Sequence, residues 1–390
     1  MVVFVKFFTL FFILQCSGVD LSSERPSSAT KESSVAWEVP EKSQGTGKIR
    51  QNAESLDKKK KLSKKKKSNK ISVVKKLSSQ KKKSSEFEQE ENLEPLPPAG
   101  SRLEILEGVK MIQLVEIDSN FLRTKLDEFT GESPVDIGGQ TMSLGARNNE
   151  QGKLLARQYL KGQFEELGFQ VREHAYESGV NFIAEKKGLY ENRFLLLGAH
   201  YDTVATVGAD DDASGVIASL AIAESIREKD LLYGLRIVLF DEEELGLLGS
   251  SAYVKKLMLD QEEDSLIGSI VLEMLGYDSD DNGAFHIVDC LQDPSNPTAG
   301  SAMLSDFLMK SVVTQGGILQ RTDACTDRSD HTAFWQENLP AVVVSQDFFG
   351  GDNNPCYHDA CDQTDRINFN YYENLTIMIG SAVSELLLQD

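Results

Sequence analysis

The chain has 390 residues and a formal net charge of −20 at pH 7, a length that allows two or three domains. The charge is unevenly divided: residues 48–84 contain 16 lysines and arginines against two acidic residues, whereas residues 85–390 contain 21 against 54. A single domain with evenly distributed charge is therefore excluded. The proportions predict a basic arm and an acidic globular part as separate physical units.

Residues 1–18 have the features of a secretory signal peptide. Lys6 lies between the apolar residues 2–5 and 7–14, a run too short for the ~18 or more apolar residues that span a bilayer. The small residues at 16–18 suit cleavage, and an uncleaved anchor is the alternative. The signal predicts a secreted, extracellular protein whose cysteines meet an oxidising compartment.

The next segment, residues 19–100, is rich in serine, lysine, glutamate and glutamine, without periodic apolar residues. Such a composition buries too little apolar surface to offset chain entropy, so we predict disorder. The lysine runs indicate a pro-segment cut at basic sites or a solvated linker, and contact with an anionic surface is compatible with both. Specific nucleic-acid binding is disfavoured because no aromatic residues are interleaved for base stacking.

From Leu103 the pattern is globular, and we take residues 101–390 as one catalytic domain. Apolar residues near helical spacing predict helices over 149–167, 214–227, 249–258, 302–313 and 371–388. Short apolar runs predict strands over 181–185, 194–199, 235–240, 267–272, 284–288 and 341–344. This alternation indicates an α/β fold, a three-layer α/β/α sandwich around a mixed, largely parallel sheet, with ligands at the carboxyl ends of the strands.

Candidate metal ligands gather in this domain, several of them directly after a predicted strand. They are His200, the aspartates 210–212, Glu243, Glu244, Glu273, and His358. Imidazole and carboxylate ligands without thiolates suit a catalytic zinc site, in which one coordination position stays open for water. In structural zinc sites all four positions are usually filled by protein ligands, cysteines among them. Each residue alone is more simply a polar core or turn residue. Together they supply ligands for two zinc ions and a general base, which indicates hydrolysis.

Five sequence blocks resemble, in order and spacing, the motifs of the M28 family of di-zinc peptidases. The blocks are Gly-Ala-His-Tyr-Asp at 198–202, Gly-Ala-Asp-Asp-Asp-Ala-Ser-Gly at 208–215, Glu-Glu-Leu-Gly-Leu-Leu-Gly-Ser at 243–250, Ser-Asp-His at 329–331, and Tyr-His at 357–358 continuing to Asp362. No single block would suffice. The resemblance covers residues 103–390.

The resemblance implies a role for each candidate ligand. Asp211 corresponds to a carboxylate shared by two Zn²⁺ ions, with His200 and Glu273 on one ion and Glu244 and His358 on the other. Two such ions, some ~3.5 to 4 Å apart, clamp a water, lower its pKa and polarise the scissile carbonyl.

Glu243 corresponds to the general base, because the family pattern Glu-Glu-x-Gly places its glycine at Gly246. The neighbouring Glu242 offers a second register and is the alternative base. Glu273 departs from the commonest pattern, which has aspartate at that position. The longer side chain of glutamate is expected to change the geometry and the metal preference of that site. We keep Glu273 as a ligand.

Three further residues are expected near the site. Asp202, two residues after His200, is placed to fix the tautomer of that imidazole. In some family members a tyrosine at the position of Tyr357 helps to hold the oxyanion, and plain packing is the alternative. His331 is expected to line the site or support it without binding metal, since the ligand set is full.

The cysteines suit disulfide formation. Cys356 and Cys361 flank His358, and a bridge between them would fix the approach of that ligand, with thiolate metal binding as the alternative. Whether Cys290 pairs with Cys325 stays open. Glycosylation of the Asn-Leu-Thr sequence at 374–376 also stays open.

The features together predict a secreted zinc exopeptidase acting on peptides, most simply an aminopeptidase. A carboxypeptidase or dipeptidase would need a cation for the substrate's terminal carboxylate, and Arg147 or Arg328 would serve. A glutaminyl cyclase shares the fold but uses one zinc, and the intact His200 and Glu273 argue against it. A catalytically inactive receptor ectodomain would lack a ligand or the base, and none is missing.

Overall fold

The computed structural model describes residues 111–204, 206–291 and 299–388, so the expected signal peptide and lysine-rich arm lie outside the described residues. The first half contains α2 (Ser119–Thr130), β1 (Val135–Ile137), β2 (Gln140–Met142), α3 (Glu150–Glu166), β3 (Gln170–Ala175), β4 (Val180–Lys186), β5 (Tyr190–His200), η1 (Ala209–Ala213), α4 (Ser214–Ile226) and β6 (Tyr233–Phe240). The second half contains α5 (Leu248–Leu259), η2 (Glu263–Ser265), β7 (Leu266–Glu273), β8 (Ala284–Val288), α6 (Ala299–Thr314), β9 (Gln320–Thr322), α7 (His331–Gln336), β10 (Ala341–Gln346), η3 (Thr364–Arg366) and α8 (Phe369–Leu388).

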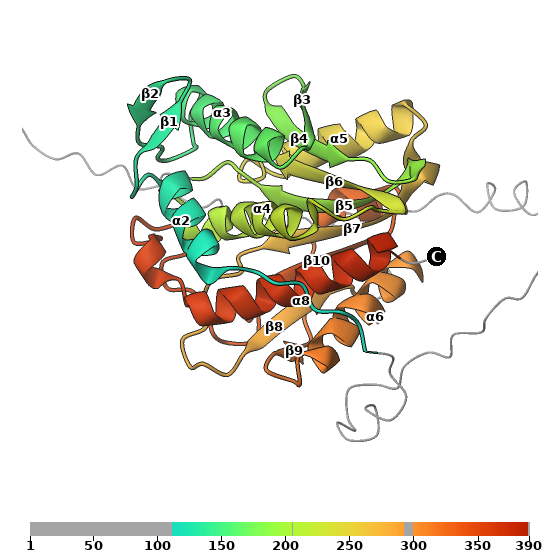
Figure 1. Ribbon diagram of the computed structural model, residues 1–390. Helices are drawn as coiled ribbons and strands as arrows, with labels where there is room; N and C mark the ends of the chain where they lie inside the picture. Colours follow the sequence, from blue (N-terminus) through green and yellow to red (C-terminus); the bar gives the residue numbers. More distant parts are fainter. Residues whose placement is uncertain (1–110, 205, 292–298, 389–390) are drawn as a thin grey trace, which may run out of the picture. The chain divides into compact units, whose positions relative to one another are not determined.

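Eight strands form one mixed sheet in the order β3-β4-β6-β5-β7-β10-β8-β9 (Figure 1). Its centre, β6-β5-β7-β10, is parallel throughout, while β4 and β8 flank this centre in antiparallel pairing. Because both faces of a parallel sheet are covered, its strands are apolar along their length, as β5 is from Phe194 to Ala199. The predicted mixed, largely parallel sheet is confirmed.

Alternate residues of each central strand face opposite helix layers. Leu195 and Leu197 of β5 pack into the cluster that includes α2, α3, α4, α6 and α8. Phe194 and Leu196 pack into a second cluster with Phe334 of α7 and residues of α5. In Figure 1, α4 and α8 cross in front of the sheet. The predicted α/β/α sandwich is therefore confirmed.

The predicted helices and strands are present within a few residues of their expected bounds. The clearest case is α3, which begins after Asn149, whose side chain accepts a hydrogen bond from Gly152 N at 3.1 Å. The helix ends before Gly168, which has a φ of 80°, a left-handed conformation that favours glycine.

Both cysteine pairs are bridged. Cys356 and Cys361 enclose the loop that carries His358, with Cα atoms 5.2 Å apart. Cys290 and Cys325, left open above, also form a disulfide, with Cα atoms 5.0 Å apart. The side chain of Asn374 lies in α8 and donates to Asn370 O at 2.8 Å. Among the helices of the described residues, none combines the length and apolar character needed to cross a membrane.

Candidate functional site

The candidate ligands converge at the carboxyl edge of the central strands. His200 is the last residue of β5, and Glu273 is the last residue of the neighbouring β7. Glu244 lies in the loop after β6, Asp211 in η1 before α4, and His358 in the loop before η3. Strand ends and loops from five parts of the chain thus meet at one point, as the parallel topology requires.

The first ligand group surrounds His200, whose side chain is 1% exposed. Its Nε2 lies 3.1 Å from Asp211 Oδ1 and 3.6 Å from Glu273 Oε1. Burial alone would lower the pKa of His200, but hydrogen bonds to Asp202, Asp211 and Glu273 raise it well above its usual value. Ser329 Oγ donates to the other Glu273 oxygen at 2.8 Å and orients that carboxylate.

The second ligand group surrounds His358. Its Nε2 lies 3.2 Å from Asp211 Oδ2 and 3.0 Å from Glu244 Oε2. Asp211 therefore offers one carboxylate oxygen to each group, and the potential ligand atoms of each group lie within 4.8 Å of one another. The two groups of potential ligand atoms thus share Asp211.

Two buried carboxylates outside both ligand groups hold this centre in place: Asp212, which the sequence analysis counted among the candidate ligands, and Asp362, to which it gave no role. Asp362 accepts hydrogen bonds from Asp210 N at 2.9 Å and Asp211 N at 3.2 Å. Asp212 accepts from His200 N at 3.2 Å and from Met274 N at 3.1 Å, and so ties η1 to the ends of β5 and β7. Both residues lie within the five sequence blocks, and this position is the sequence feature that could have indicated a role at the site.

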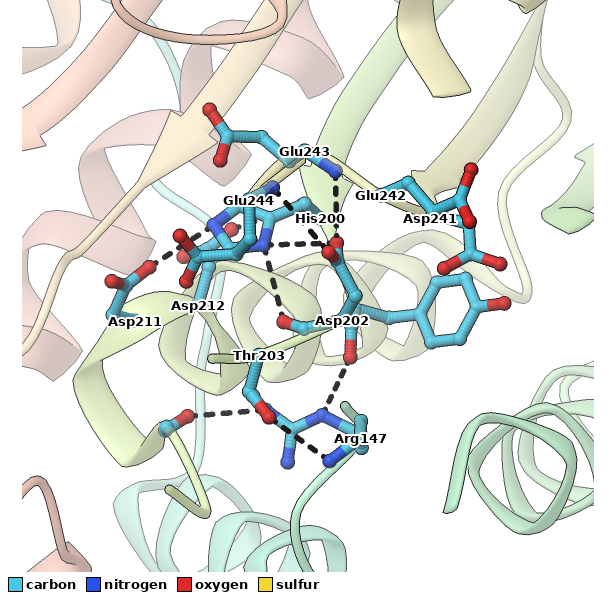
Figure 2. A network of polar contacts seen from close by, with 12 residues as sticks. Arg147, His200, Asp202, Thr203, Asp211, Asp212, Asp241, Glu242, Glu243 and Glu244 are labelled. Atoms are coloured by element: carbon cyan, nitrogen blue, oxygen red, sulfur yellow. Dashed lines mark hydrogen bonds and ion pairs between the residues drawn. The ribbon is translucent and has the colours of Figure 1, made fainter. Parts of the chain in front are cut away.

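Asp202 connects the first ligand group to the loop after β6 (Figure 2). The Nδ1 atom of His200 lies 3.2 Å from the backbone oxygen of Asp202 and 3.5 Å from its Oδ1. The Asp202 carboxylate also accepts hydrogen bonds from Glu243 N at 3.1 Å and Glu244 N at 3.4 Å. Its backbone oxygen and carboxylate thus both lie beside the imidazole, and the carboxylate holds the backbone of the following glutamates.

The three consecutive glutamates point in different directions. Glu243 and Glu244 line the pocket at the ligand cluster, together with Glu273. Burial raises the pKa of Glu243 to about 10 and that of Glu244 to about 7, with further increases from nearby carboxylates. Glu242 lies outside the pocket lining, and Figure 2 shows it beside Asp241, away from Asp211. The geometry thus favours the register with Glu243 facing the site.

The pocket has an acidic floor and a largely apolar wall. Besides Asp211, Glu243, Glu244, Glu273 and His358, the lining residues are Met274, Val288, Thr326, Arg328, Ser329, Val343, Ser345, Phe348, Phe349 and Tyr357. The Tyr357 ring stacks on His358 with ring centroids 3.8 Å apart. Burial raises the pKa of Tyr357, so its phenol stays protonated and able to donate. The Cys356–Cys361 disulfide encloses both residues.

Two of the expectations above need correction. Arg147 does not face the pocket: it is 1% exposed and donates to three backbone carbonyls, those of Tyr201, Val207 and Gly208. His331 does not line the pocket either, because it is fully buried against Trp335. Its Nε2 lies 3.0 Å from the backbone oxygen of Thr326, which lines the pocket, and this contact agrees with the alternative that His331 supports the site without binding metal. Arg328 does line the pocket.

Comparison with known proteins agrees with this arrangement. Residues 181–383 match the sequence profile of Peptidase family M28. Leucine aminopeptidase 2 of Trichophyton rubrum is 31% identical over 195 residues, which are 50% of this chain and 39% of that protein. The chain therefore spans about two fifths of the length of this curated relative.

Solved structures share the fold. LapA aminopeptidase of Legionella pneumophila matches with a TM-score of 0.58 and 18% identity, covering 73% of this chain and 79% of that one. A glutaminyl cyclase of Bacteroides thetaiotaomicron bound to N-acetylhistamine matches with a TM-score of 0.56 and 19% identity, covering 70% and 99%. The family profile spans more than half of the chain and contains all five candidate ligands, so the protein is a member of peptidase family M28.

Proposed function

We propose that the protein is a secreted, zinc-dependent aminopeptidase that releases N-terminal amino acids from peptides. One observation carries the proposal: two groups of potential ligand atoms meet at Asp211, which offers one oxygen to each. A bridging carboxylate is the arrangement that a two-metal hydrolytic site needs. The name of the Trichophyton relative, leucine aminopeptidase 2, supports the same reading.

The residues present fit two zinc ions. His200, Asp211 and Glu273 would hold one ion, and Asp211, Glu244 and His358 the other. The Oε1 atom of Glu244 is buried and has no hydrogen-bond partner among the described residues, which suits an atom whose partner is a cation. When bound, the two ions would supply Lewis acidity to the attacking water and to the scissile carbonyl.

The chain's own residues would move the protons. Glu243 lines the pocket without belonging to either ligand group. Bound cations would lower its pKa from the raised value of the metal-free site, so that its carboxylate could accept a proton from water and return it to the leaving amine. Tyr357, held as a protonated phenol, would donate a hydrogen bond to the oxyanion. Asp202 would fix the positions of the His200 imidazole and the Glu243 backbone relative to each other.

The pocket favours a substrate with a free N-terminal ammonium and an apolar side chain. With two zinc ions held by Asp211, Glu244 and Glu273, the carboxylate left to attract the substrate's ammonium would be that of Glu243. Val288 and Phe349 contribute to the apolar wall of the pocket. Both features suit the first residue of a peptide.

Dipeptide or carboxypeptidase-type hydrolysis is a second candidate, because Arg328 lines the same pocket. Its guanidinium forms no ion pair that the described part of the chain reveals, so it is available to a substrate carboxylate. The first candidate is preferred because the Trichophyton relative is named a leucine aminopeptidase.

Secretion is proposed from the signal-like residues 1–18 together with the two disulfides, which persist in oxidising compartments. Residues 19–100 are proposed as a pro-segment or linker, and 101–390 as the catalytic domain. Nothing in the basic arm favours a specific nucleic-acid partner.

A substrate panel tests the proposal. Leucine p-nitroanilide should be cleaved, its N-acetylated form should not, and Leu-Leu-amide should be cleaved at least as fast as Leu-Leu. Cleavage restricted to Leu-Leu, and lost in Arg328→Gln, would support dipeptide hydrolysis instead. Cyclisation of N-terminal glutamine without cleavage of any of these substrates would replace the peptidase assignment with a cyclase.

A further inference from the structure

Glu242, which precedes the proposed base, adopts an unusual backbone conformation. It is 5% exposed and has a φ of 58°, in the left-handed region that favours glycine. A glutamate persists in this conformation when its surroundings hold it there. The side chain shows how it is held.

Three donors surround the Glu242 carboxylate on the side away from the pocket. Ser178 Oγ donates to Oε2 at 2.5 Å, and the Tyr176 hydroxyl lies 3.1 Å from the same oxygen. Lys153 Nζ lies 3.8 Å from Oε1 and 2.7 Å from Asp241 Oδ1, with its own side chain only 7% exposed. The carboxylate is therefore bound to α3 and to the segment that joins β3 and β4.

The opposite side of the same loop is held by Asp202. Its carboxylate accepts the backbone N–H groups of Glu243 and Glu244 at 3.1 and 3.4 Å. The loop is thus fixed on both sides, by Glu242 from behind and by Asp202 from the ligand cluster. Between these two points the side chains of Glu243 and Glu244 enter the pocket.

We propose that Glu242 is a positioning residue, whose carboxylate, held by Lys153, Tyr176 and Ser178, fixes the loop so that Glu243 faces the site. Glu244 is also held by His358, 3.0 Å away, and depends less on this contact. Glu242 does not touch the substrate. The inference rests on the proposed function, in which Glu243 is the base. Movement of the Glu243 carboxylate by a fraction of an ångström is enough to lower a catalytic rate strongly.

The test compares three substitutions in the full-length, zinc-loaded protein. Glu242→Gly accepts the left-handed backbone but has no carboxylate, Glu242→Gln keeps size and one acceptor, and Ser178→Ala removes one donor. We expect the kcat for leucine p-nitroanilide to fall about 10-fold or more in Glu242→Gly and less in the other two. KM and zinc content should change by less than about threefold.

Two readouts separate positioning from general destabilisation. The control Glu185→Gln disturbs another largely buried ion pair, with Arg236, and should lower Tm without lowering kcat. In metal-free protein, hydrogen exchange at residues 241–248 should be faster in Glu242→Gly than in wild type, because the loop has lost one of its two attachments. The rate losses of Glu242→Gln and Ser178→Ala should also be less than additive in the double variant, since both act on one contact.

The inference is overturned if Glu242→Gly keeps the wild-type kcat, or if that variant loses rate while exchange at 241–248 is unchanged. If Glu242→Gly does not fold, Glu242→Gln and Ser178→Ala at wild-type rate overturn it in the same way. These outcomes differ from failure of the proposed function, in which Glu243→Gln itself would remain active.

Discussion

Asp202 Oδ1 accepts the backbone N–H of Glu243 at 3.1 Å and lies 3.5 Å from Nδ1 of His200, which is also 3.2 Å from the backbone oxygen of Asp202. One side chain thus contacts both a proposed zinc ligand and the loop that carries the proposed base. Disturbing Asp202 should therefore affect metal binding and turnover together, whereas disturbing Glu242 should affect turnover alone.

Asp202→Asn tests this difference. The amide replaces an acceptor with a donor beside the N–H groups of Glu243 and Glu244, and removes the charge near His200. We expect zinc affinity and kcat/KM each to fall by on the order of 10- to 100-fold. Competition with a zinc chelator and steady-state kinetics measure the two, with the exposed Asp136→Asn as control. Unchanged zinc affinity would contradict the assigned role.

Removal of metal should abolish activity and lower stability. Without cations, the carboxylates of Asp211, Glu244 and Glu273 are left close together and largely shielded from solvent, which is unfavourable. We expect a lower Tm after chelation, recovery of both properties with added zinc, and about two zinc ions per chain by elemental analysis. Full activity in metal-free protein would refute the account, as would one zinc with cyclase activity.

Stability should depend on pH through His331. Burial lowers the pKa of His331 to about 4, so between about pH 6.5 and 4 the unfolded state binds more protons than the folded state. The contribution of the neutral imidazole is complete above pH 6.5 and decreases as pH falls. His331→Gln should be less stable than wild type at pH 8, and that gap should shrink by about 1–2 kcal/mol at pH 5. A gap in denaturation free energy that is constant across pH would contradict this prediction.

Loss of the Cys356–Cys361 disulfide should lower zinc affinity more than it lowers folding stability. The double variant Cys356→Ser, Cys361→Ser removes a bridge of sequence separation 5. By restricting the unfolded chain, such a short bridge stabilises the fold by about 2 kcal/mol or less. Zinc affinity should fall because His358 is no longer held in its loop. The matched control removes Cys290–Cys325, of sequence separation 35, and should reduce stability more while leaving zinc affinity unchanged. Equal zinc affinity in both variants would contradict the role.

The central strands were predictable because they are buried on both faces and therefore appear as apolar runs. The edge strand β3 was not, since its Arg172, Glu173 and His174 break the apolar pattern that the sheet interior produces. Helix α2 was missed although a signal existed: Leu122, Leu126 and Phe129 follow helical spacing and are all fully buried. Helix α7 has six residues, too few for a periodic pattern.

That the candidate ligands lie together could be predicted from the spacing of the blocks, but the contacts that hold them in place could not. The bonds from Asp362 to the backbone of η1 join residues about 150 positions apart, and no local pattern encodes such a contact. Arg147 was named only as a cation that would serve a substrate carboxylate in the alternative carboxypeptidase or dipeptidase reading. In the structure its guanidinium can be buried because it donates hydrogen bonds to three backbone carbonyls and lies over the ring of Phe129.

The most direct test of the account compares Glu243→Gln with Glu244→Gln. Glutamine keeps the size of either side chain, but it cannot accept a proton and is a poor metal ligand. We expect Glu243→Gln to lose on the order of 10²-fold or more in kcat with nearly full zinc content. Glu244→Gln should lose zinc from one site and regain part of its activity with excess zinc. Loss of zinc in Glu243→Gln, with full zinc in Glu244→Gln, would contradict the assignment of base and ligand.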